Sequence, residues 1–344
     1  MDAGAGWKSL ADRSRGVEFI DACLRGAAQV MLQNNPVTGL LILIGIAVGS
    51  VHGGHPRVIL GVVVALVVGT LAAVLLRADG SSIRAGLFGF SPLLTGAGVT
   101  TFMQNRPLMW VFLVLGAAAT TVVTLALTTV FNTWGVPALT FPFVLTTWFL
   151  LMGAYQFARL TLATGNPPAL PGNAPLAAAR LTGDVVPAFL EGVSQVFLVE
   201  SWIGGLIILA GLVLNSRWSA AFAVIGAVGG TLLAIAFETE AHSVNQGLWG
   251  FNAVLTAIAL GAVLYKPTPP TVIYALFGIV FTVFVQAALT TALTPLGIPT
   301  LTAPFVVATW LFLLPKRKFT PIPQHERYAD GLLTALRPEA GKPG

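Results

Sequence analysis

The sequence predicts an all-α polytopic membrane protein made of two homologous halves. Its composition, four long apolar segments and an internal repeat support this fold class. Of the 344 residues, 56% are hydrophobic and only 9% are charged. A water-soluble fold of this size cannot bury that much apolar surface, so a lipid bilayer must cover part of it.

Four segments are long enough to cross a bilayer, which takes about 20 apolar residues for roughly 30 Å of hydrocarbon. They run about that length without a charged residue, at 58–76, 108–131, 218–237 and 271–289. The residues before the first span are polar and mixed in charge, and no cleavage site of a secretion signal follows them. We therefore expect the first helix to stay in the mature chain.

Three blocks of the first half recur in the second half, in the same order and at nearly constant spacing. GAAQVMLQNNPVTGLLIL from Gly26 matches GVSQVFLVESWIGGLIIL from Gly192. GLFGFSPLLT from residue 86 matches GLWGFNAVLT from residue 247, and PALTFPFVLTTW from residue 137 matches PTLTAPFVVATW from residue 299. Shared apolar composition does not produce such an ordered match, so the sequence indicates duplication.

We predict five spans in each half, and an odd number inverts the second copy relative to the first. In the first half they are 16–52 (interrupted at 34–36), 57–76, 93–104, 108–131 and 142–158. With the N-terminus inside, most Lys and Arg residues fall on the cytoplasmic side, as the positive-inside rule requires. The expected organisation is a cytoplasmic segment 1–15, inverted repeats 16–164 and 187–316 with a linker 165–186, and a cytoplasmic tail 317–344.

The repeated blocks also predict a pore. Inverted repeats commonly place a permeation site at their interface, built from short or broken helices at matching positions. We expect the two Gly-rich mid-half blocks to form one pore half-helix each, whose free backbone groups line a wet cavity. Close helix packing is the alternative for such glycines, but Phe90 and Phe251 occupy the same position in both copies, which favours the pore.

Polar side chains inside the spans suggest what the pore conducts. Gln29 matches Gln195, and Thr140 matches Thr302, each threonine lying two residues before a proline. These groups offer hydrogen bonds without fixed charge, so a small neutral solute passes while an ion loses its hydration. For each residue alone, an interhelical hydrogen bond is the alternative. Apolar walls that suit a flat molecule come from Phe90, Leu94, Phe251 and Leu255.

The block GLWGFNAVLTAIALG at 247–261 resembles the signature of the urea transporter family. QVMLQNNPVTG, QVFLVESWIGG, LTFPF and LTAPF resemble its other repeated segments, and the resemblance covers residues 16–316. It implies ten spans and two pore half-helices, and a homotrimer in which each protomer conducts urea down its gradient. We expect a plasma (inner) membrane location with both termini cytoplasmic.

The resemblance also implies roles for single residues. Gln29 and Gln195 match the positions that bind urea near the two mouths, Thr140 and Thr302 match the central constriction, and the slot walls match Phe90, Leu94, Phe251 and Leu255. The chain departs from symmetry where Pro92 stands opposite Ala253 and where Glu200 stands opposite Asn34. The two mouths therefore need not be chemically equivalent.

Other function classes have weaker support. An ion-coupled carrier needs an ionisable relay in the membrane, for which Glu191 and Glu200 are the candidates. An enzyme needs a nucleophile with a base or a metal cluster, and the single cysteine, Cys23, and the four histidines show no such spacing. We expect neither catalysis nor a cofactor. A channel for ammonia, water or a short amide is the nearest alternative.

Overall fold

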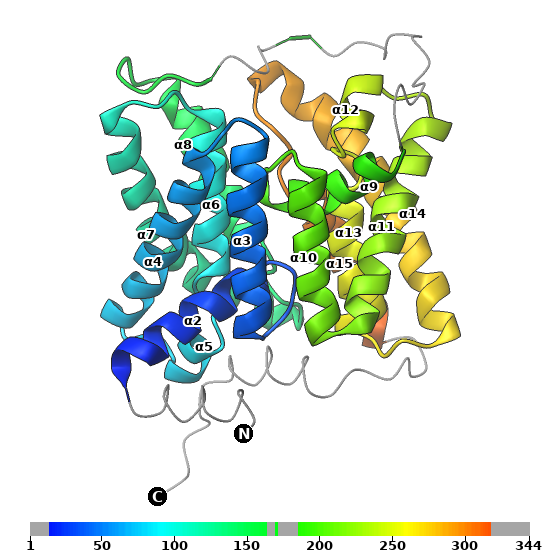
Figure 1. Ribbon diagram of the computed structural model, residues 1–344, viewed down its shortest axis with the longest axis horizontal. Coiled ribbons are helices and arrows are strands. Elements are labelled where there is room, and N and C mark those ends of the chain that lie inside the picture. Colours follow the sequence, from blue (N-terminus) through cyan, green and yellow to red (C-terminus); the bar gives the residue numbers. More distant parts are fainter. Residues whose placement is uncertain (1–13, 164–168, 171–184, 318–344) are drawn as a thin grey trace, which may run out of the picture.

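A computed structural model describes residues 14–163, 169–170 and 185–317, and these residues are predominantly helical (Figure 1). The expected terminal segments and linker lie almost entirely outside the described residues. An isolated antiparallel bridge joins Met103 to Leu162. The helices of the first half are α2 (Arg15–Gln29), α3 (Pro36–His52), α4 (Arg57–Leu75), α5 (Gly80–Arg84), α6 (Phe90–Phe102), α7 (Pro107–Trp134) and α8 (Phe141–Ala154).

The second half follows the same order of long and short helices, with short 3₁₀ and π segments added. Its elements are α9 (Val185–Ser194), η1 (Gln195–Phe197), α10 (Trp202–Asn215), α11 (Arg217–Ala236), α12 (Ala241–Asn245), α13 (Phe251–Ile258), the π-helix η2 (Ala259–Val263), α14 (Pro269–Leu293), η3 (Thr294–Leu296), α15 (Ala303–Leu313) and η4 (Leu314–Arg317).

Four helices are long and apolar enough to cross a bilayer: α4, α7, α11 and α14. They coincide with the four charge-free segments predicted from the sequence. The number rises to five if α9–η1 and α10, which are bent by 74° at a short break, count as one span. Large apolar side chains such as Leu60, Leu115 and Phe277 are exposed on these helices, as contact with lipid requires. The fold is that of a polytopic membrane protein.

The predicted interruption at 34–36 separates α2 from α3. Asn35 caps α3, since its side chain accepts hydrogen bonds from Val37 N at 2.8 Å and Thr38 N at 3.2 Å. At the equivalent position of the second half, Ser201 caps α10. The chain turns through a left-handed residue just before each break, and the two leucines there, residues 32 and 198, share a φ of 58°.

The mid-half blocks are helical only in their second parts, and α6 begins three residues before the predicted start at 93. Residues 86–89 form turns, and α6 begins only at Phe90. The reason is local, because Gly86 and Gly247 have φ values of 76° and 69°, outside the helical region. Glycine is also required at both places for space, since a Cβ would lie 2.3 Å from Gly26 N and 2.4 Å from Gly192 N respectively.

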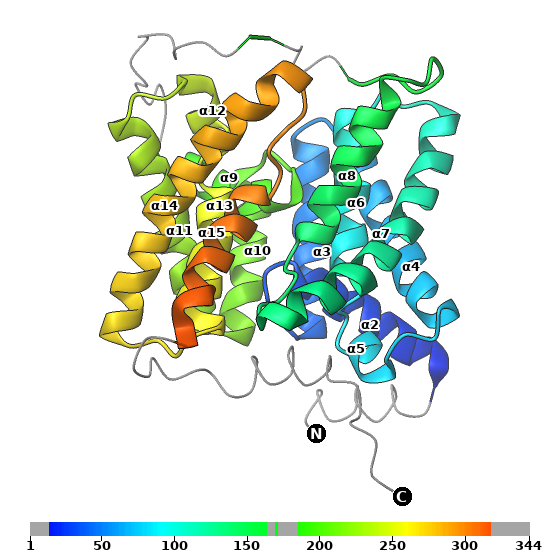
Figure 2. The same ribbon diagram turned by 180° about the vertical axis from the view of Figure 1, so that it is seen from behind.

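The two halves lie side by side and meet along α3 and α10 (Figures 1 and 2). Glycines bring these two helices close together: a Cβ on Gly45 would lie 2.7 Å from Ile208 Cγ1, and one on Gly204 would lie 2.8 Å from Gly45 O. The Thr38 hydroxyl donates to Gly211 O across the same contact at 2.9 Å. The equivalent short helices α5 and α12 lie at opposite ends of the molecule in both views.

Candidate functional site

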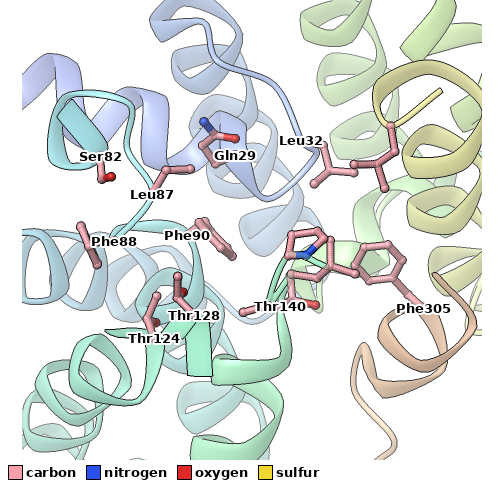
Figure 3. Close-up of a pocket in the computed structure, with 14 residues that line it drawn as sticks. Gln29, Leu32, Ser82, Leu87, Phe88, Phe90, Thr124, Thr128, Thr140 and Phe305 are labelled. Atoms are coloured by element: carbon pink, nitrogen blue, oxygen red, sulfur yellow. The ribbon is translucent and has the colours of Figure 1, made fainter. Parts of the chain in front are cut away.

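A pocket lies between α2, the turns before α6, α7 and the loop before α8. Its empty volume is about 740 Å³, counting the open solvent at its mouth. Figure 3 shows Gln29 and Leu32 along one side of it, Thr124, Thr128 and Thr140 along the other, and Phe90 between them. The lining residues are Gln29, Leu32, Ser82, Leu87, Phe88, Phe90, Thr124, Thr128, Pro137, Ala138, Leu139, Thr140, Leu264 and Phe305.

Three of the eight predicted binding residues line this pocket: Gln29, Phe90 and Thr140. The other five lie outside its lining. Leu94 and Leu255 are completely buried in the apolar core. Gln195, Phe251 and Thr302 are also buried, at the equivalent places of the second half.

Thr140 and Thr302 meet, although 162 residues separate them. Their hydroxyl oxygens lie 2.7 Å apart and are buried. Each threonine occupies the N-cap position of its helix, α8 or α15, and a proline follows in the first turn. The residue before each threonine, Leu139 or Leu301, is left-handed, with φ of 51° and 52°. The same turn in the two halves therefore brings two neutral hydroxyls together.

Gln29 and Gln195 make equivalent hydrogen bonds. The amide nitrogen of Gln29 donates to Ala85 O at 2.9 Å, and that of Gln195 donates to Gln246 O at 3.0 Å. Both side chains are 6% exposed. Because these bonds fix the direction of each carboxamide, the amide oxygen is held as an acceptor for a solute N–H.

The surroundings of the two glutamines differ in charge. Near Gln29, Arg25 pairs with Asp21 at 2.6 Å and donates to the Asn34 side chain at 2.8 Å. In the second half the equivalent positions hold Glu191 and Glu200, and Glu200 accepts a hydrogen bond from Gln246 at 2.9 Å. An ion pair of Arg25 and Asp21 therefore lies near Gln29, whereas two acidic residues lie near Gln195.

The sequence analysis missed several lining residues. Thr124 and Thr128 lie one turn apart on the apolar helix α7, and that pair of polar residues was a usable signal. Phe305 and Leu264 come from the second half and reach a pocket built mainly by the first. Leu264 follows the π-helix η2, and the sequence carries no pattern for that placement.

The pocket offers amide, hydroxyl and backbone groups between aromatic and aliphatic side chains, and its lining contains no charged residue. Among the described residues, no three His, Cys, Asp or Glu side chains lie close enough to hold a metal ion. The arrangement suits a small uncharged molecule that exchanges its hydrogen bonds with water for bonds with the protein.

Comparison with known proteins agrees with this chemistry. The family model described as "Urea transporter" matches residues 20–317. Urea transporter 1 of Capra hircus is 32% identical over 322 residues, which is 91% of this chain and 81% of that protein. Urea transporter 1 of Ovis aries is also 32% identical and that of Rattus norvegicus is 31% identical, with the same coverage.

Proposed function

This chain belongs to the urea transporter family, and we propose that it is a passive channel that conducts urea down its gradient. The observation that carries the proposal is the contact between Thr140 and Thr302. Two neutral hydroxyls, one from each half, meet beside a pocket that has no charged lining residue. Such a constriction accepts a neutral hydrogen-bonding solute and rejects ions.

Urea is planar and offers four N–H donors and one carbonyl acceptor. In the proposed path it leaves water at Gln29, slides past the ring of Phe90 and exchanges hydrogen bonds with the two constriction threonines. It then leaves past Phe251 and Gln195, and Leu94 and Leu255 stiffen the slot walls from behind. An ion on this path loses its hydration without replacement, because hydroxyls and amides carry no compensating charge.

The proposed architecture is two inverted repeats, 16–164 and 187–316, with ten spans and cytoplasmic termini in the plasma (inner) membrane. The opposite positions of α5 and α12 support inversion. The left-handed residues, which occur in equivalent pairs such as Arg77 with Glu238, support the repeat itself. A homotrimer with one pore per protomer is part of the proposal, and the mass of the detergent-solubilised protein in native mass spectrometry tests it.

A channel for ammonia, water or a short amide is the second candidate. An uncharged pocket favours it as well, since hydroxyl and amide groups also accept these solutes. An ion-coupled carrier would need Glu191 and Glu200 as its relay. The three functions differ in which solute crosses the membrane and in whether it accumulates.

Flux into proteoliposomes tests the proposal. We expect fast urea equilibration in stopped-flow measurements, slower movement of water and acetamide, and no accumulation in a proton or sodium gradient. Thr140→Val and Thr302→Val should each lower urea permeability about tenfold, because losing about 1.4 kcal/mol from one hydrogen bond raises the barrier by that amount. Accumulation above equilibrium would overturn the channel.

Thr95→Val is the matched control. Thr95 is a buried threonine that pairs with Thr120 at 3.1 Å outside the pocket lining. The variant therefore loses a threonine hydroxyl, as Thr140→Val and Thr302→Val do, without a change at the constriction. Urea permeability of this variant should stay within about twofold of the unaltered protein. An equal loss of flux in all three variants would contradict a special role for Thr140 and Thr302.

A further inference from the structure

Two amide side chains of the second half hold the loop that carries Thr302. The amide nitrogen of Asn252 on α13 donates to Leu301 O at 3.2 Å, and its amide oxygen accepts from Phe305 N at 3.2 Å. Gln286 on α14 accepts from Asn252 at 3.1 Å and donates to Leu248 O at 2.6 Å. Asn252 therefore binds the chain on both sides of Thr302.

No such bridge is present in the first half as the structure describes it, at residues 14–163. Ser91 stands at the position of Asn252, and its buried hydroxyl has no hydrogen-bond partner among the described residues. Thr124 stands at the position of Gln286 and donates to Thr120 O on its own helix at 2.7 Å. Neither side chain holds the loop that carries Thr140 as the amides hold its counterpart.

The volume that the amides fill in the second half belongs to the pocket in the first. The pocket is lined by Thr124, Leu87 and Leu139, which are equivalent to Gln286, Leu248 and Leu301. The loop before Thr140 therefore has open space beside it, whereas the loop before Thr302 is tied to two helices. A loop that lacks side-chain restraint and has space beside it moves more easily.

Other supports of the two loops are matched. Trp310 Nε1 donates to Pro137 O at 2.8 Å, and Trp148 Nε1 donates to Pro299 O at 2.9 Å. The backbone bonds that start α8 and α15 are both 3.1 Å long. The amide bridge is therefore the hydrogen-bonded support that distinguishes the second loop from the first.

We propose that Asn252 and Gln286 are positioning residues that fix Thr302, so that the constriction widens and narrows on the Thr140 side. This inference rests on the proposed function, because it requires the two threonines to lie on the path of the solute. The fixed threonine sets the width that a solute must match, and the movable one adapts to it. Size selectivity among ureas therefore depends on the bridge.

Exchange of equivalent residues tests this role. The double variant Asn252→Ser with Gln286→Thr gives the second half the side chains of the first and removes both carboxamides together, so neither side-chain amide is left without its partner. When the loops that carry Thr140 and Thr302 can both move, the permeability of N-methylurea relative to urea should rise about fivefold. The reverse double variant, Ser91→Asn with Thr124→Gln, should slow amide exchange at 137–143, because both loops are then held; this readout does not depend on the pocket that Thr124 lines.

Thr282→Val is the matched control. Thr282 pairs with Thr256 at 2.9 Å between the same two helices, one turn from Gln286, and it does not touch the loop. This variant should lower the melting temperature and leave the permeability ratio unchanged. An equal rise of the ratio in Thr282→Val and in the double variant would overturn the proposal, as would an unchanged ratio in a folded double variant.

Hydrogen–deuterium exchange of the unaltered protein gives a second test that needs no variant. Amides at 299–305 should exchange more slowly than those at 137–143, and equal or faster exchange would overturn the proposal. Absence of urea flux in the unaltered protein would refute the proposed function itself. Flux that falls in Thr140→Val, with a ratio unaffected by the exchanges, would refute the positioning role alone.

Discussion

The two halves of the molecule bend the chain at the same places and fill the space around the bends differently. Leucines at equivalent positions before the breaks and before the constriction threonines share nearly the same positive φ. Beside those turns the first half has a pocket lined by Thr124, where the second has the Gln286–Asn252 bridge. The matching backbone turns fix where groups lie, and single side chains determine what each half does with the position.

The residues around Gln29 and Gln195 repeat this contrast in charge. Arg25 and Asn34 lie near Gln29, whereas Glu191 and Glu200 occupy the equivalent positions near Gln195. The glutamines themselves bind equivalent carbonyl groups at nearly equal distances. Substitution of a feature that the two halves share should therefore have the same effect on stability or flux in both halves. Substitution of a feature that differs between them should have unequal effects.

The largest effect is expected at the shared helix contact next to each break. A Cβ on Gly39 would lie 1.7 Å from Leu24 O, and one on Gly205 would lie 1.9 Å from Leu190 O. Gly39→Ala and Gly205→Ala should each lower the free energy of unfolding by more than about 4 kcal/mol, because backbone must move. Thermal unfolding in detergent measures this loss.

Gly153→Ala is the control for those variants, since its Cβ would meet nothing nearer than Phe157 at 3.9 Å. It should unfold at nearly the temperature of the unaltered protein. If one half tolerated alanine at the contact and the other did not, the two helix pairs would not be equivalent.

The next-largest effect, on urea permeability, should differ between the two halves. Trp310→Phe removes the indole hydrogen bond to Pro137 O and keeps an aromatic ring beside Phe131 and Phe141. We expect urea permeability to fall about threefold to tenfold, because that loop has no amide bridge. Trp148→Phe frees Pro299 O, but Asn252 still holds the loop, so the change should stay below about twofold. Stopped-flow flux compares them, and equal losses would contradict unequal support.

A smaller effect should come from the mouths. Guanidinium has the planar shape of urea and a positive charge, so the acidic residues near Gln195 attract it more than the Arg25–Asp21 ion pair near Gln29 does. We expect it to inhibit urea efflux several-fold better when added to the face that carries α12, and less so at high salt. Efflux from vesicles of known orientation measures this.

The Glu200→Asn variant gives the second mouth the residue of the first. It should reduce the sidedness of guanidinium inhibition, whereas inhibition by neutral thiourea should not depend on side in either protein. If guanidinium still inhibited Glu200→Asn as unequally from the two faces as it inhibits the unaltered protein, the Glu200 carboxylate would not be the cause of that difference.

The smallest effect concerns α5 and α12. Asp79 caps α5, and hydrogen bonds from the Ser81 hydroxyl at 2.5 Å and from Ser82 N at 2.7 Å hold the pKa of Asp79 below its ordinary value. Since the folded pKa is lowered, the cap contributes fully above the ordinary value and is lost as pH falls through the lowered one. Glu240, at the equivalent position, makes no side-chain cap on α12.

Acidification to about pH 3 should therefore speed amide exchange at 80–84 more than at 241–245, after correction for the intrinsic rates. Asp79→Ala should remove this difference, because no cap remains to be lost. Equal acid sensitivity of the two short helices in the unaltered protein would contradict the role of the cap.

The sequence allowed the four long spans and the break at 34–36 to be predicted, because a charge-free length and an Asn-Asn-Pro motif act locally. The repeat also paired Thr140 with Thr302, which the structure brings within 2.7 Å. Their role at the constriction stays a prediction, as do the number of ten spans and the domain boundaries.

Features that depend on contacts between distant segments could not be predicted. The repeat paired Ser91 with Asn252, yet nothing in the sequence showed that Asn252 reaches Leu301 and Phe305. The π-helix η2 likewise has no pattern in the sequence that predicts it. Leu94 was expected as a wall residue from the repeat and the family resemblance; the structure buries it in the apolar core, and its role stays a prediction.

The glycine contact between α3 and α10 bears on how fast a solute can cross. Backbones that touch at Gly45 and Gly204 leave no layer of side chains on which one half could slide past the other. Sliding of one half past the other is therefore sterically opposed in this molecule, and each crossing needs only local movement at the constriction. The activation energy of urea flux should then be lower than that of a carrier whose two halves rearrange, and an Arrhenius plot should be straight.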